Sequence, residues 1–107
     1  MAHISDAVLA SAVSNAGGAG IIGSGGKSAE WVRDEVRKAK TLTDKAFGVN
    51  LMLMAPNNEE IIGVLCEEKV AFVTLGAGNP VPFIERFHAV GTKVIPVVPN
   101  VRLAKRI

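Results

Sequence analysis

The sequence predicts an α/β fold built on a parallel sheet, and two observations support this prediction. Four short apolar runs rich in β-branched residues follow one another at 20–23, 47–54, 70–75 and 94–98. Runs that are apolar at nearly every position are typical of strands covered on both faces. Helical segments lie between them, and the strand starts recur every roughly 22 to 28 residues, the length of a strand plus a crossover helix.

The first half of the chain is predicted to hold two helices and two strands. Ser5 is expected to cap a helix over 6–15, which stops at the glycine pair 17–18 before the first strand. Ser28 is expected to cap the second helix, whose apolar positions repeat with helical spacing. These positions are Trp31, Val32, Val36 and Ala39.

The second half continues the alternation. Asn57 or Asn58 is expected to cap a helix that carries its apolar residues over 61–66, after strand 47–54. Pro80 or Pro82 opens the next helix, and Gly91 closes it. A last helix is predicted over 100–107, after strand 94–98.

This order begins with a helix that no strand precedes and ends within a helix. A complete (β/α)8 barrel takes about 250 residues, whereas this chain has 107. We therefore expect one domain over residues 1–107 that is a partial TIM barrel cut at both ends. It would hold about four parallel βα units, strands 2–5 of the parent barrel. A complete flavodoxin-like domain is the alternative, and it requires a crossover after the first strand.

Composition excludes several classes of function. The net charge is +2, but without the last six residues it is −1, so no basic nucleic-acid surface is indicated. A single cysteine, Cys66, allows no internal disulfide and indicates a reducing, cytoplasmic location. No apolar stretch is long enough to span a bilayer, and no metal-ligand spacing occurs.

Small residues and amides follow each predicted strand, where parallel α/β proteins bind ligands. The G-x-G-x-x-G match at 18–23 follows a helix and enters a strand, which is the wrong context for a dinucleotide fold. The stretch ending in Gly26-Lys27-Ser28 misses the P-loop spacing by one residue. Tight βα turns also use such residues, so each loop taken alone is weak support for a site.

Asn50 is the most informative single residue. Alternation along strand 47–54 places Phe47 and its partners on a helix-packing face, and Asn50 with Met52 on the face that points into a barrel. A buried amide must find partners, and it can donate and accept at once, which suits the edge of a flavin or nucleobase. A partner in the neighbouring backbone is the alternative.

Several stretches together carry a family resemblance: 12–18 running into 20–23, then 42–45 before the Phe-Gly-Val-Asn motif at 47–50, then Gly-Ala-Gly-Asn-Pro at 76–80 and 93–99. With them the whole chain resembles the flavin-dependent enoyl-acyl-carrier-protein reductases of bacterial fatty-acid synthesis. These belong to the wider nitronate monooxygenase (2-nitropropane dioxygenase) family. The first strand and the second half of that family's barrel, with its active-site histidine and its FMN-phosphate loops, have no counterpart in the chain.

The resemblance implies a TIM barrel with FMN at its mouth, and hydride transfer from NADH or NADPH to an enoyl thioester on acyl carrier protein. It implies FMN contacts at seven positions: Met1, Ala2, Asn50, Met52, Gly76, Ala77 and Gly78. Which residues are catalytic stays unknown from the resemblance. A homo-oligomer is expected, with neither nucleic acid nor membrane as partner. Nitronate monooxygenase activity, or an inactive half-barrel that self-associates, are the alternatives.

Overall fold

The structure, a computed structural model, describes residues 5–97. Helices and strands alternate along the chain, as predicted. The elements are α1 (Ala7–Asn15), β1 (Gly20–Gly23), α2 (Ala29–Leu42), β2 (Phe47–Met52), α3 (Asn58–Glu68), β3 (Phe72–Gly76), α4 (Val81–His88) and β4 (Lys93–Pro96). The helix predicted over 100–107 lies outside the described residues.

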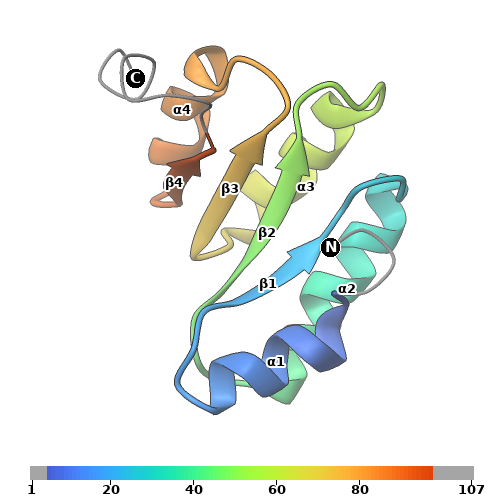
Figure 1. The fold of residues 1–107 in the computed structure, drawn as a ribbon, viewed down its shortest axis with the longest axis vertical. Helices are drawn as coiled ribbons and strands as arrows, with labels where there is room; N and C mark the ends of the chain where they lie inside the picture. The colour runs from blue at the N-terminus through green and yellow to red at the C-terminus, as the bar shows by residue number, and fades with distance from the viewer. Residues whose placement is uncertain (1–4, 98–107) are drawn as a thin grey trace.

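The four strands form one parallel sheet in the order β1-β2-β3-β4. Each strand therefore pairs with its neighbours in sequence, and all arrowheads in Figure 1 point to the same end of the sheet. No crossover follows β1, so the flavodoxin-like alternative is wrong. Sequential parallel pairing with helical connections is the arrangement of part of a (β/α)8 barrel, which confirms the predicted fold class.

The hydrophobic core lies between the sheet and its helices. On β2 the residues facing the helices are Phe47, Val49 and Leu51, all buried, and Leu53 just beyond the strand is buried with them. The same alternation buries Val73 and Leu75 on β3. We call this helix-covered side of the sheet the outer face, and the opposite side the inner face.

Two of the predicted helix caps need comment. Ser28 caps α2 as expected, because its hydroxyl oxygen accepts from the backbone N–H of Trp31 at 3.1 Å. The expected Ser5 cap of α1 is wrong: Asp6 is the cap, and its carboxylate accepts from Leu9 N–H at 3.0 Å. The hydroxyl of Ser5 instead donates to the carbonyl oxygen of Ile21. Ser5 therefore joins the start of α1 to β1.

The bounds of three strands differ from those predicted. β2 ends at Met52 rather than at 54, because the carbonyl of Met52 accepts from Ala55 N–H at 3.0 Å and turns the chain. β3 is Phe72–Gly76 instead of 70–75, and β4 is Lys93–Pro96 instead of 94–98. α4 is also shorter at its end, since it stops at His88, ahead of Gly91.

Ion pairs connect α2 to α3 on the solvent side of the helix layer. Arg33 pairs with Glu67 at 2.6 Å, while Arg37 and Lys40 both reach Glu68 at 3.3 Å. Burial acts to raise the pKa of Glu68, but hydrogen bonds from Arg37 and Lys40 outweigh it, and the pKa of this carboxyl is lowered. These pairs tie neighbouring βα units together.

Candidate functional site

The inner face of the sheet carries side chains in layers set by the strand register. The layer nearest the start of the strands holds Ile21, Gly48, Phe72 and Lys93. The middle layer holds Gly23, Asn50, Thr74 and Ile95. Met52 and Gly76 pair in the layer nearest the carboxyl ends of the strands. That end is where parallel α/β proteins bind ligands, and we call it the mouth.

Asn50 lies half-buried in the middle layer, as its position in strand 47–54 predicted. Its side-chain oxygen accepts a hydrogen bond from the hydroxyl of Thr74 at 2.7 Å. Below it, the ring of Phe72 covers Gly48: a Cβ on that glycine would lie 2.3 Å from the ring. The Asn50 amide therefore lies one layer above the Phe72 ring. On the neighbouring strand its register partner is Gly23, which has no side chain.

The predicted contact residues at the end of β3 lie beside Met52, the predicted contact residue at the end of β2. Met52 is 41% exposed on the inner face, and Gly76 is its register partner. A Cβ on Gly76 would have only ordinary contact with Val97, at 3.8 Å, whereas one on Gly78 would lie 2.7 Å from Cβ of Leu53. Gly78 thus allows the turn to pack on Leu53, just after β2, whereas the described residues would tolerate a Cβ on Gly76.

Ala77 adopts a left-handed backbone conformation, with φ of 56°. A residue with a Cβ pays about 1–2 kcal/mol there, and such strain is concentrated at ligand-binding sites. Ala77 is exposed at the tip of the turn between Gly76 and Gly78. Strain in this turn is therefore a second, independent feature of the mouth.

Hydrogen bonds link the loops around the mouth to one another. The hydroxyl of Ser24 donates to the backbone carbonyl of Asn50 at 2.5 Å. The side-chain nitrogen of Asn57 donates to the carbonyl of Lys27 at 2.9 Å. The N–H of Leu53 donates to the carbonyl of Gly76 at 2.9 Å. The loops after β1, β2 and β3 are therefore held in one fixed arrangement.

Of the seven predicted contact residues, Met52, Gly76, Ala77 and Gly78 thus lie at the mouth, and Asn50 lies one layer below it. Met1 and Ala2 lie outside the described residues. Ser5, the first described residue, lies near the mouth. Its carbonyl accepts from the N–H of Gly23, the last residue of β1, at 2.8 Å.

Two residues of the site were not identified from the sequence. Thr74 was hidden within an apolar run, although it is the only polar residue of β3; its contact with Asn50 depends on the register. Asn57 or Asn58 was expected to cap α3. Asn57 occupies the cap position, but its side chain makes no capping bond and instead donates to the carbonyl of Lys27.

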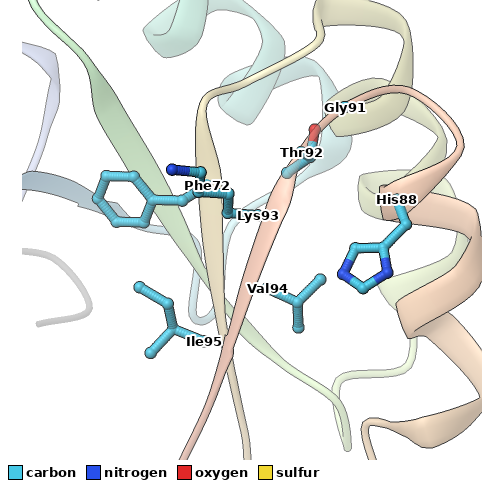
Figure 2. A pocket seen from close by; sticks show the side chains of 7 residues that line it. All are labelled: Phe72, His88, Gly91, Thr92, Lys93, Val94 and Ile95. Carbon is cyan, nitrogen blue, oxygen red and sulfur yellow. The ribbon is translucent and has the colours of Figure 1, made fainter.

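A hollow of about 550 Å³ lies elsewhere, along β4. Figure 2 shows Phe72, Lys93 and Ile95 on one side of the strand and Val94 and His88 on the other. The hollow therefore straddles the edge of the sheet toward its amino-terminal end and is not part of the mouth. Cys66 is also remote from the mouth, near Arg86 on α4. Burial raises the pKa of its thiol, and the charge of Arg86 only partly opposes this, so it is a poor nucleophile.

Two further observations concern the described part of the chain. Between residues 5 and 97, no three His, Cys, Asp or Glu side chains are grouped closely enough to hold a metal ion. None of the helices there combines the length and the apolar character that a membrane span requires.

Comparisons with known proteins agree with this fold. The model of the nitronate monooxygenase family matches residues 1–63. The structure of FabK from Thermotoga maritima is similar, with a TM-score of 0.96 and 46% identity, over 99% of this chain and 34% of that one.

Two relatives are similar over smaller shares of their own length. A (3aS,4S,5R,7aS)-5-hydroxy-7a-methyl-1-oxo-octahydro-1H-indene-4-carboxyl-CoA dehydrogenase of Rhodococcus jostii (strain RHA1) is 32% identical, over 92% of this chain and 28% of the relative. A nitronate monooxygenase of Pseudomonas aeruginosa (strain PAO1) is 45% identical, over 56% and 17%. The chain thus spans about a third of the length of the proteins it resembles, or less.

Proposed function

The chain belongs to the nitronate monooxygenase family of oxidoreductases, and from that premise we propose that it forms the first part of an FMN-dependent enoyl-acyl-carrier-protein reductase. NADH or NADPH would be the hydride donor. The observation that carries this proposal is the Asn50 amide, held at 2.7 Å from Thr74 beside a glycine-lined mouth. Similarity to FabK over nearly the whole chain supports the reductase branch.

The residues at the mouth fit a flavin ring. The ring's pyrimidine edge carries hydrogen-bond acceptors, and the side-chain nitrogen of Asn50 supplies donors. Gly76 places no side chain against the ring, and Met52 offers an apolar, adaptable surface. We propose that Asn50, Met52 and the turn 76–78 hold FMN, with Met1 and Ala2 as further contacts.

Bound FMN would supply the hydride-transfer chemistry, and the protein would supply its position and surroundings. Asn50 would donate to the ring and fix its orientation. The linked loops at Ser24, Asn57 and Leu53 would keep the mouth in its shape before the ligand arrives, which lowers the entropic cost of binding.

A thioester substrate has independent support. The Rhodococcus relative is named for a carboxyl-CoA substrate, and this chain is similar to it over 92% of its length. We therefore propose an enoyl thioester on acyl carrier protein as the substrate class, in bacterial fatty-acid synthesis and in the cytoplasm.

Nitronate oxidation is the second candidate, and one observation favours it. The Pseudomonas nitronate monooxygenase is as similar in identity as FabK, although over only 56% of this chain. A third candidate, a half-barrel that self-associates, is favoured by exposed apolar side chains on the inner face. Met52 is 41%, Ile95 50% and Val97 62% exposed. Two copies would supply the eight strands of a barrel, so we propose a homo-oligomer.

The first test is retention of flavin. The purified chain is mixed with excess FMN and passed through gel filtration, and its absorbance is recorded between about 300 and 550 nm, where bound flavin absorbs. We expect flavin bands to elute with the protein. A colourless protein peak would contradict FMN binding by this chain.

Two glycine variants show whether retained flavin sits at the mouth. Gly76→Ala adds a methyl group where the fold has room, and Gly63→Ala does the same in α3, where nothing lies within 4 Å. Both should fold, but only Gly76→Ala should lower FMN affinity. Equal affinity in both would place the flavin elsewhere.

The reaction is tested on the flavin-loaded chain. Under anaerobic conditions NADH or NADPH should bleach the flavin bands, and an enoyl thioester should restore them. Oxygen consumption with a nitronate, in the absence of NADH and NADPH, would instead support the monooxygenase candidate.

A further inference from the structure

Asn50 has a single side-chain neighbour that can hold it. Its register partner on β1 is Gly23, which has no side chain, and its partner on β3 is Thr74. On the same strand, Gly48 below it is covered by the Phe72 ring. Within residues 5–97, the hydroxyl of Thr74 is therefore the polar group that can hold the Asn50 amide.

The direction of this hydrogen bond decides what the amide can offer a ligand. The hydroxyl donates to the side-chain oxygen, at 2.7 Å, because that oxygen carries no hydrogen. In the part of the chain that the structure describes, the side-chain nitrogen donates to no carbonyl or side chain. Among residues 5–97, both N–H groups of Asn50 are therefore left to face a ligand on the inner face.

We propose that Thr74 is a positioning residue: it turns the Asn50 amide so that the mouth presents hydrogen-bond donors to a ligand atom that accepts. This inference rests on the proposed function, in which the ligand is FMN. Threonine suits the task because its β-branched side chain has few rotamers, so its hydroxyl is held in place by the strand. The ligand atom nearest Asn50 would then be a carbonyl oxygen or an unprotonated ring nitrogen.

Two substitutions separate the hydroxyl from the shape of Thr74. Thr74→Val keeps the branched shape and removes the donor, while Thr74→Ser keeps the donor and removes the methyl group. The half-buried position of Thr74 leaves both variants able to fold. If the hydroxyl positions Asn50, the Asn50 amide should be held in Thr74→Ser and not held in Thr74→Val.

The first measurement needs no flavin. In the apo protein, the ¹⁵N relaxation of the Asn50 side-chain amide, assigned by its absence in Asn50→Ala, reports whether the group is held. We expect an ordered amide in the wild type and Thr74→Ser, a mobile amide in Thr74→Val, and N–H protons that exchange freely with water. An equally ordered amide in Thr74→Val, or N–H protons protected from exchange in the wild type, would overturn the inference.

The second measurement is the dissociation constant for FMN, by quenching of flavin fluorescence. We expect about a tenfold weaker affinity in Thr74→Val, the effect of one net hydrogen bond, and near wild-type affinity in Thr74→Ser. Equal affinity in Thr74→Val and the wild type would overturn the inference. Failure of the wild type to bind FMN would contradict the proposed function alone, because the relaxation measurement still decides how Asn50 is held.

Discussion

Successive residues of each strand lie on opposite faces of the sheet, and the two faces differ in burial and chemistry. Val49 and Leu51 on the outer face are fully buried, whereas Asn50 between them is half-buried and Met52 is 41% exposed on the inner face. The outer face holds apolar side chains packed against helices. The inner face holds an amide, a hydroxyl and glycines that leave space. Stability and ligand binding are therefore assigned to alternate residues, and substitutions should separate them.

The largest difference is expected between neighbours on β2. Leu51→Ala empties a fully buried position and should cost about 3 kcal/mol of the free energy of unfolding, within the range for buried leucine. Met52→Ala on the exposed inner face should cost less than about 1 kcal/mol. Urea unfolding of both variants measures this, and comparable losses would contradict the division between the faces.

Glycine substitutions sharpen the same comparison. A Cβ on Gly20, which faces α1, would lie 1.9 Å from the backbone oxygen of Ala10, and backbone cannot easily move. The atoms nearest to a Cβ on Gly48 would all belong to the ring of Phe72, a half-buried side chain that can move. We expect Gly20→Ala to lose about 2–3 kcal/mol and Gly48→Ala about 1 kcal/mol. The reverse order in thermal melts would show that the inner face is the more tightly packed.

A smaller effect should distinguish the mouth from the opposite end of the sheet. Ala77 at the mouth and Lys69 after α3 both have left-handed backbone, with φ of 56° and 51°. Replacing either with glycine removes strain but adds chain entropy, for a net gain of about 0.5 kcal/mol. Calorimetry should show this gain in both, while FMN titration should show weaker binding only in Ala77→Gly. Unchanged FMN affinity in Ala77→Gly would mean that FMN binding does not depend on the backbone conformation of the turn 76–78.

An effect of similar size, which depends on pH, is expected on the solvent side of the helices. The pKa of Glu68 is lowered in the folded state, so its charged form adds stability above its unfolded pKa, and this is lost as the pH falls through the folded pKa. Glu68→Gln should therefore cost about 0.5 kcal/mol at neutral pH, as ion pairs near the surface do. Denaturant midpoints of the variant and the wild type should converge once the pH falls below the lowered pKa of Glu68.

Glu60→Gln is the control for this experiment. Glu60 is exposed on α3 and makes no ion pair with another described residue. It should show no pH-dependent difference from the wild type. A similar dependence in both variants would indicate general charge effects rather than the pairs with Arg37 and Lys40.

Local patterns were sufficient to predict most of this fold. The apolar runs located all four strands, and the Ser28 cap located α2 to the residue. The error in the cap of α1 came from two neighbouring residues that can play the same hydrogen-bonding role. Ser5 and Asp6 could each cap α1. Asp6 does so because the hydroxyl of Ser5 donates to the carbonyl oxygen of Ile21 on β1. Such a choice depends on contacts between residues far apart in sequence.

The site was predicted only as far as single strands allow. Alternation along 47–54 was enough to place Asn50 and Met52 on the inner face, since the period of a strand is a local property. The partner of Asn50 is not local. Thr74 lies beside it only because β2 and β3 pair in one register, and one residue of slip would place Val73 or Leu75 there.

The sequential order of the strands also has a consequence for cooperativity. Each βα unit is held by its neighbours in sequence, and the last strand is the least covered: every residue of β4 is at least partly exposed, whereas most of β1 is buried. Opening can therefore begin at β4 and α4 and leave the β1–β2 pair intact. Amide hydrogen exchange would then follow a gradient along the chain. The amides of β4 and α4 would exchange fastest, and those of β1 and β2, the strand that carries Asn50, would exchange more slowly.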